Sequence, residues 1–362
     1  MAVTSYELLD ATRDATTTRT LLHESIPLTG TIHSGTYGTF PDEGNIKNYA
    51  HGQFQSVYDY PYLSSSANHI FDLTVGYDEA SPLSASSTTR TQQKKKINMY
   101  NQFSQVLLGY TGAADAVRKF ESDLTLDETA ATLMKEAFFI NLSRLITKDQ
   151  IKKGSFSVTL GTGSWALPFV SSSTLTDSAS SDTAGTTNTV GGDYGLLSGP
   201  SGHPRGLIFY QSGIVVLTAS AFSASSPNGA TAAGSTQFFS QSRPADPYMD
   251  INAALTGASI TASCDALRHR IQNISFTNTT EINSSIYFCR VPHNKYNYSS
   301  NPTYLSSSTV RVKSVNTDTP ISYITTIGLY NSSNELLATA KLSEPLRKDP
   351  NNELTLRVRL DY

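Results

Sequence analysis

Histidines are the first candidates for acid–base or metal chemistry in this chain of 362 residues. No two of them are separated by the four positions that place two zinc ligands on one helical face, and none lies in an H-E-x-x-H motif or beside a cysteine pair. The spacing therefore predicts no metal site. The seven are His23, His33, His51, His69, His203, His269 and His293.

Serine- and glycine-rich turns are the next candidates, for nucleophilic or phosphate chemistry. Residues 195–199 (GLLSG) come nearest to the G-x-S-x-G nucleophile elbow, but the serine is one position late. Residues 161–164 (GTGS) follow a predicted strand, yet they lack the third glycine and the lysine of a phosphate-binding loop. We expect a tight β-turn there. Carboxylates for glycoside cleavage cannot be assigned without geometry.

Residues 264–270 (CDALRHR) are the densest run of ionisable groups. They could form an acid–base cluster, but a solvated edge or a salt-bridged contact to a partner subunit is favoured. Cys264 and Cys289 are expected to be small buried apolar residues in or beside strands. The sequence does not decide whether the two form a disulfide. We therefore predict no catalytic, cofactor-binding or metal-binding residue, and no enzymatic activity.

The composition favours a protein whose surface is covered by neighbours. Charged residues make up 16% of the chain and the net charge is −3, whereas about a quarter of residues is charged in typical soluble domains. The only basic run, residues 94–96, is expected to be a solvated helix start, so nucleic acid is an unlikely partner. No apolar stretch approaches the roughly 18 residues that span a bilayer, and the N-terminus lacks the pattern of a secretory signal. We expect no membrane association.

Hydrophobic periodicity divides the chain into four segments. Residues 1–90 mix aromatics with glycine and proline and predict an extended N-terminal arm ordered by contacts. Residues 91–154 predict a helical hairpin. Its first helix carries apolar residues at spacings of three and four and ends at Gly109, and its second helix starts at Asp127 and stops at Gly154.

The remaining two segments predict strands. Residues 155–260 form a β-rich domain with loops rich in serine, threonine and glycine at 171–192 and 218–237, and with two buried strands within 206–217. Residues 261–362 predict a β-sandwich, with strands at 273–276, 285–291, 309–315, 322–330, 335–342 and 353–362. In the last strand, Leu354, Leu356, Val358, Leu360 and Tyr362 face one way. The expected fold class is mainly β with a helical hairpin, an extended N-terminal arm and an antiparallel β-sandwich C-terminal domain.

Six short stretches carry a distinctive pattern, namely residues 96–102 (KINMYNQ), 148–156 (KDQIKKGSF), 287–290 (YFCR), 297–304 (NYSSNPTY), 325–331 (TTIGLYN) and 335–342 (ELLATAKL). These stretches resemble virion structural proteins of tailed bacteriophages, above all those of T4-like and marine myophages. The last two are the most telling, because they are similar to a hairpin motif of tail-fibre and baseplate attachment proteins. That family pattern carries no catalytic residue.

The resemblance implies a structural component of a tailed phage virion that joins neighbouring subunits in the tail baseplate or fibre-attachment region. Its partners would be other copies of itself in a ring or symmetric assembly, and other virion proteins of the baseplate, tail tube, fibre or neck. It would be located in the virion, assembled in the host cytoplasm. A neck or collar protein that joins head to tail is one alternative. A receptor- or carbohydrate-binding tail module is another, although the lone Trp165 gives no obvious stacking platform.

Overall fold

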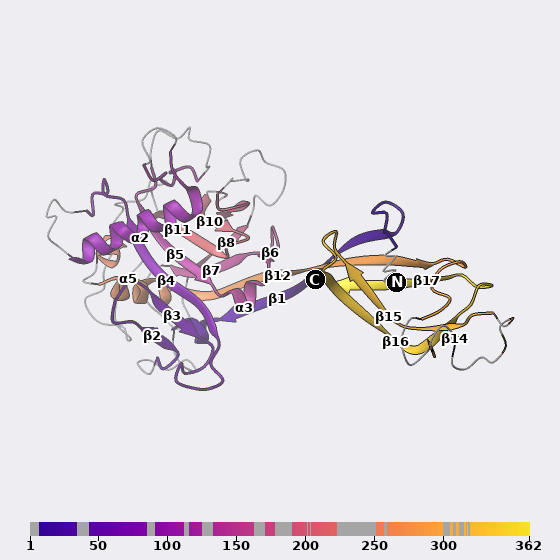
Figure 1. Cartoon of the computed structure of the whole chain (residues 1–362). Helices are drawn as coiled ribbons and strands as arrows, with labels where there is room; N and C mark the ends of the chain where they lie inside the picture. Colours follow the sequence, from indigo (N-terminus) through magenta and orange to yellow (C-terminus); the bar gives the residue numbers. More distant parts are fainter. Residues whose placement is uncertain are drawn as a thin grey trace. The chain divides into compact units, whose positions relative to one another are not determined.

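The structure, a computed structural model, divides into two compact units. Unit 1 comprises Met1–Leu21 and Glu281–Tyr362, and unit 2 comprises Leu22–Thr280. Strands β1 (Ala15–Thr29) and β12 (Ile271–Val291) contribute residues to both units and are neighbours in one sheet (Figure 1). The structure describes residues 7–34, 43–84, 91–111, 116–124, 133–162, 171–177, 190–200, 202, 204–222, 251–256, 259–299, 305–306, 309–310, 315, 317 and 319–362.

Unit 2 is built on a large antiparallel sheet, which confirms the mainly β prediction. The strand order is β1-β12-β7-β8-β9-β10-β11-β5-β4-β3-β2, and β6 pairs with β12. The remaining strands are β2 (Ile46–Asn48), β3 (Gln55–Tyr58), β4 (His69–Tyr77), β5 (Glu136–Leu142), β6 (Gln150–Ile151), β7 (Ser157–Thr162), β8 (Ser171–Asp177), β9 (Tyr194–Ser198), β10 (Pro204–Phe209) and β11 (Ile214–Thr218).

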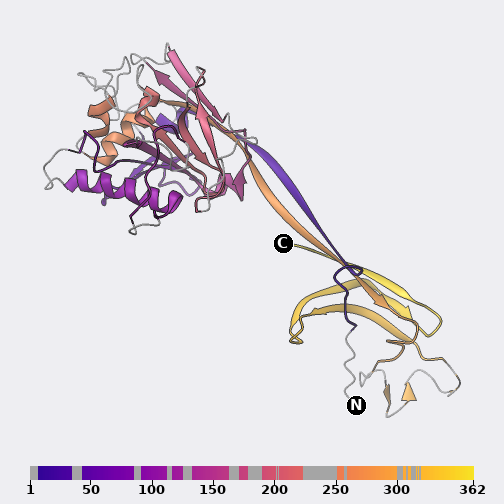
Figure 2. The ribbon, with the colours of Figure 1, turned by 90° about the horizontal axis from the view of Figure 1, so that it is seen from above.

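Helices cover the central strands of unit 2 on both faces (Figures 1 and 2). Phe138 and Ile140 of β5 belong to the hydrophobic cluster that includes α4 (Ile251–Thr256) and α5 (Ile260–Arg268), whereas Phe139 belongs to the cluster with α2 (Thr91–Leu108). Strand β4 approaches α2 closely, because a Cβ at Gly76 would lie 2.7 Å from the backbone nitrogen of Tyr100. Short helices α1 (Gly30–Ser34), α3 (Arg144–Thr147) and η1 (Ala219–Phe222) complete the unit.

The predicted helical hairpin is half right. Helix α2 ends as predicted, with Gly109 at φ +81°. The predicted second helix is wrong, because its described part forms β5, α3 and β6. Strand β5 is buried on both faces, so its sequence is a continuous apolar run that lacks the alternation of a half-buried strand. Asp127 lies outside the described residues, and Gly154 (φ +77°) follows a strand instead of a helix.

The predicted extended arm is confirmed only near its start. Strand β1 is 15 residues long and mostly exposed. Residues 46–77, by contrast, form β2, β3 and β4, and their side chains Val57, Phe71 and Leu73 are fully buried. The aromatic and turn residues of this stretch therefore belong to a packed sheet.

The predictions for the next segment are confirmed for its buried strands, whereas the loop expected at 171–192 is wrong over Ser171–Asp177, which form β8. The two buried strands expected within 206–217 are β10 and β11, and the strand expected around Phe156 is β7. The turn expected at 161–164 is wrong for its first two residues, because Gly161 and Thr162 belong to β7 and pair with β8. Residues 163–164 lie outside the described residues, as do most of the two loops rich in serine and threonine. The boundary expected at residue 260 falls inside unit 2, at the start of α5.

Unit 1 contains two main antiparallel sheets, as a β-sandwich requires. Strand β17 (Leu354–Asp361) pairs with the second half of β12, while β15 (Ser322–Tyr330) pairs with β16 (Leu336–Lys348) in a separate hairpin (Figure 2). A further short pair is β13 (Leu305–Ser306) with β14 (Thr309–Val310), and residues 311–314 of the strand expected there lie outside the described residues.

The predicted register of the last strand is confirmed over β17. Val358 is 5% exposed, and its neighbours Arg357 and Arg359 point to solvent. The prediction for Tyr362 is wrong, because this residue follows the strand and is 71% exposed.

Candidate functional site

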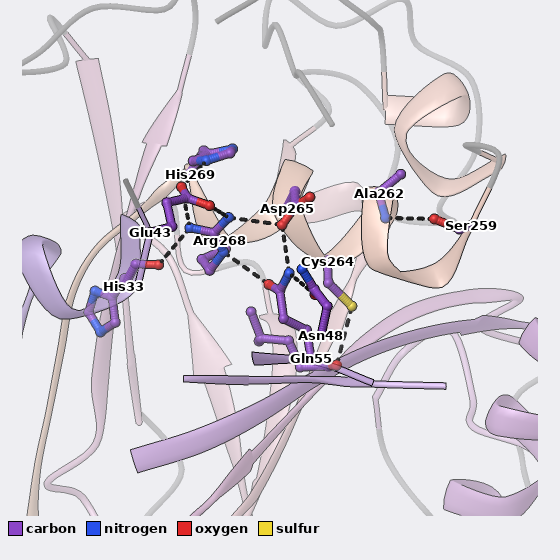
Figure 3. Close-up of polar contacts among 11 residues, drawn as sticks. His33, Glu43, Asn48, Gln55, Ser259, Ala262, Cys264, Asp265, Arg268 and His269 are labelled. Carbon is purple, nitrogen blue, oxygen red and sulfur yellow. Dashed lines mark hydrogen bonds and ion pairs between the residues drawn. The ribbon is translucent and has the colours of Figure 1, made fainter. Parts of the chain in front are cut away.

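The ionisable segment 264–270 lies on and just after α5, whose start is fixed by a cap. The Ser259 side chain accepts a hydrogen bond from the backbone nitrogen of Ala262 at 3.1 Å. The segment is not the solvated edge that the sequence favoured, because Arg268 and Arg270 are fully buried and His269 is 2% exposed. Its charged partners belong to the same chain (Figure 3). We call Glu43, Gln55, Asp265, Arg268 and His269 the buried ion cluster.

Arg268 is the centre of the buried ion cluster. Its two terminal nitrogens form a bidentate pair with the Glu43 carboxylate, at 2.8 and 2.7 Å. One of these nitrogens also donates to Asp265 Oδ1 at 2.8 Å, and Nε donates to Gln55 Oε1 at 2.9 Å (Figure 3). A planar guanidinium flanked by two carboxylates is the arrangement in which a buried arginine is best compensated.

Two neighbours fix the other ends of this network. Gln55 Nε2 donates to Asp265 Oδ1 at 2.7 Å and to Asn48 Oδ1 at 2.8 Å, so β2 and β3 are joined to α5. His269 Nε2 lies 3.0 Å from Glu43 Oε1. The cluster therefore binds three stretches of chain that are far apart in sequence, namely the segment at Glu43, β2–β3 and α5.

Burial governs the protonation states around the cluster. It lowers the pKa of His33 to about 3, with a further contribution from the positive charge of Arg268. Burial also lowers the pKa of His269, although Glu43 opposes the change. Burial favours the neutral form of Glu43, but His269 and Arg268 together hold the pKa of this carboxyl below its usual value. At neutral pH Glu43 is thus a carboxylate beside the Arg268 guanidinium, and the imidazoles of His269 and of the neighbouring His33 are neutral.

This arrangement is suited to holding structure. The lone pairs of Glu43 and Asp265 are directed at Arg268, His269 and Gln55. Over the described residues there is no group of three or more histidine, cysteine or acidic side chains with the geometry to hold a metal ion. The acid–base cluster considered from the sequence is present as a set of ionisable groups, but the Arg268 guanidinium, Asp265 Oδ1 and His269 Nε2 are engaged in pairs within the buried ion cluster.

Both cysteines are free thiols, so no disulfide joins them. Cys264 is buried on α5, not on a strand, and donates a hydrogen bond to the carbonyl of Leu73 at 3.2 Å. Burial raises the pKa of this thiol, which keeps it protonated and unreactive. Cys289 is half-buried on β12, opposite Leu356 of β17.

The lysine run at the start of α2 is not wholly solvated, in contrast to the prediction. Lys96 is 1% exposed, and its ammonium donates to the Leu255 carbonyl at 2.6 Å and to Ser263 Oγ at 3.1 Å. Burial lowers its pKa to about 8. This lysine joins α2 to the α4–α5 pair.

The other described histidines lie at separate places. His51 and His69 are on the β2–β4 part of unit 2, while His23 contacts Thr279 and His293 contacts Glu353. His203 lies outside the described residues, as does Trp165. Sequence reasoning singled out Arg268 and His269 but missed Glu43 and Gln55, whose only local signal is a turn before a short strand.

Comparison with known proteins gives this chain no family. No protein-family model, curated protein or solved structure matched it. Within the described residues, no helix is both long and apolar enough to cross a membrane.

Proposed function

We propose that this chain is a structural component of a tailed phage virion, joining neighbouring subunits in the tail baseplate or fibre-attachment region. Its partners would be further copies of the chain and other virion proteins of the baseplate, tail tube, fibre or neck. The proposal assigns it no enzymatic activity, no cofactor and no membrane or nucleic-acid partner.

The observation that best supports the proposal is the outward display of large apolar side chains on the β15–β16 hairpin, the segment with the strongest phage resemblance. Tyr323 is 61% exposed, Leu336 is 52% exposed and Leu337 is 68% exposed. Tyr330 pairs directly with Leu336 across the hairpin and is 45% exposed. Tyr330 and Leu336 therefore form an exposed apolar pair at the turn end of the hairpin. Exposed large apolar side chains that adjoin one another are typical of protein–protein contact sites.

The hairpin end that carries Tyr330, Leu336 and Leu337 is fixed by its turn. Asn331 Oδ1 accepts hydrogen bonds from the backbone nitrogens of Ser333 and Glu335, at 2.9 and 2.8 Å, and Asn334 adopts φ +63°. A preorganised turn lowers the entropy lost when a partner binds. The apolar residues beside it can therefore act as anchors.

The test is incorporation into particles during infection by the phage that encodes the chain. An epitope-tagged copy should be found in purified tailed particles, and Leu337→Asp should reduce incorporation strongly without altering the folded state. Leu145→Asp on α3 is the matched control, because Leu145 is 60% exposed but belongs to unit 2. A chain that stays in the lysate and is absent from particles would refute the proposal.

A further inference from the structure

The strands β2, β3 and β4 carry a row of polar side chains on one face. Lys47 pairs with Ser56, Ser56 pairs with Asp72, and Asp72 pairs with Asn141 of β5. Residues directly opposite each other on neighbouring strands project from the same face of a sheet. The row therefore places an ammonium, a carboxylate and an amide on one face, with the buried Ser56 hydroxyl between the first two.

The carboxylate in the row is oriented by its neighbours yet remains accessible. Asp72 Oδ1 accepts a hydrogen bond from Ser56 Oγ and lies 2.8 Å from His69 Nε2. Tyr49 Oη is 3.3 Å from Ser56 Oγ. The Asp72 and His69 side chains are 23% and 30% exposed, so a ligand can reach both.

Aromatic rings flank the Lys47 end of the row. Tyr49 stacks on His51, with ring centroids 5.1 Å apart and planes 10° apart, and Phe54 lies 4.8 Å from Tyr49. The Lys47 ammonium is 4.8 Å from the Tyr49 ring centroid. Each of these four side chains is partly or largely exposed.

A second aromatic group follows at the end of β3. Tyr58 lies 5.5 Å from His69 and 6.3 Å from Tyr62, and the Lys47 ammonium is also 5.9 Å from the Tyr62 ring. Tyr62 is 37% exposed and Tyr60 is 46% exposed. Aromatic rings of both groups thus lie close to Lys47, and the second group also contacts His69.

We propose that this face of β2–β4 is a saccharide-binding site. A sugar ring offers an apolar face of C–H groups that packs on aromatic rings, and hydroxyls that pair with a carboxylate, an amide or an ammonium. A protein partner would favour a patch whose centre is depleted of charge, whereas the centre here contains Lys47 and Asp72. A nucleic acid would be repelled by Asp72 in a chain of net charge −3.

Binding of the full chain to defined saccharides tests the site. The probes are chitohexaose, cellohexaose, laminarihexaose, dextran oligosaccharides and purified lipopolysaccharide, each at millimolar concentration, measured by saturation-transfer NMR and calorimetry. At least one should bind, and Tyr62→Ala should weaken its binding by about tenfold. Asp72→Asn should weaken it by at least as much, because the replaced oxygen no longer accepts hydrogen bonds as an anion.

Matched variants separate loss of the site from loss of the fold. Tyr323→Ala removes an equally exposed tyrosine from unit 1 and should leave saccharide binding unchanged. If Asp72→Asn does not fold, Tyr62→Ala and Lys47→Gln decide the matter. The proposal is overturned if none of the probes binds, or if bound saccharide is held equally well by all these variants. It is also overturned if Tyr62→Ala impairs only particle incorporation, which would assign this face to a protein partner.

Discussion

Replacement of Arg268 by methionine is the sharpest perturbation of the buried ion cluster. Methionine is similar in length and apolar, so it fills much of the space that the guanidinium leaves. It removes the positive charge that faces Glu43 and Asp265, whose side chains are only 8% and 13% exposed. The variant therefore measures how far two nearly buried carboxylates destabilise the fold when their counter-ion is absent.

The expected loss follows from the contacts. Arg268 donates two hydrogen bonds to Glu43 and one to Asp265. Removal of one partner from a buried ion pair destabilises a protein by about 3–5 kcal/mol, because the remaining charge is desolvated and unpaired. Domains are typically stable by about 5–15 kcal/mol, so unit 2 should lose roughly a fifth or more of its free energy of unfolding.

Urea denaturation followed by circular dichroism measures this change in the free energy of unfolding. Faster amide hydrogen exchange in β3 and α5 of the variant would show that the loss of stability lies in unit 2. The triple variant Arg268→Met, Glu43→Gln, Asp265→Asn should recover much of the loss, since no charge then stays unpaired. A loss below about 1 kcal/mol in the single variant, the size typical of exposed ion pairs, would refute the reasoning.

Three further predictions follow. Burial lowers the folded-state pKa of His33 to about 3 and also lowers that of His269 from 6.5, so the unfolded chain binds more protons than the folded one. The free energy of unfolding of unit 2 should therefore fall by roughly 4 kcal/mol as pH falls from 6.5 to 3. A melting temperature independent of pH over that range would contradict this. Lys348→Met should destabilise unit 1 by about 2 kcal/mol, because the fully buried ammonium donates hydrogen bonds to three oxygens at 2.6–3.1 Å. Unchanged amide hydrogen exchange in β16 of this variant would argue against the prediction. Val358→Asp should lower the free energy of unfolding of unit 1 by roughly 3 kcal/mol or more. Arg357→Asp on the exposed face should change it by no more than about 0.5 kcal/mol, and thermal melts of the two variants measure the difference.

Half-buried strands were the elements best predicted from the sequence. The expected strand at 322–330 coincides with β15, and the alternation in β17 places Val358 inside and Arg357 outside. Such strands encode their two faces with a local period of two residues. The information lies within the strand itself, so no tertiary partner is needed to find it.

Strand β5 shows where local pattern fails. Phe138 and Phe139 are both fully buried, one in each of the two hydrophobic clusters of unit 2. A strand covered on both faces has no polar side, and its apolar run resembles that of a buried helix. Only the presence of α2 on one face and α5 on the other distinguishes the two, and neither is visible from the segment.

The buried ion cluster was beyond local prediction for a different reason. Arg268 and Glu43 are 225 residues apart, and Arg268 and Gln55 are 213 apart. The density of charge at 264–270 indicated ionic partners, but their identity depends on how the sheet brings β3 beneath α5. The same holds for the β2–β4 row, whose members come from separate strands.

The composition of unit 1 has a consequence for biosynthesis. Its residues up to Leu21 are synthesised before unit 2, yet they belong with Glu281–Tyr362, and β12 receives its partner β17 only after both units' earlier strands have been made. Residues 22–280 are contiguous, so unit 2 can fold while the nascent chain is still growing. Unit 1 must instead wait for translation of β17, which leaves the residues up to Leu21 without their native neighbours while residues 22–280 are being made.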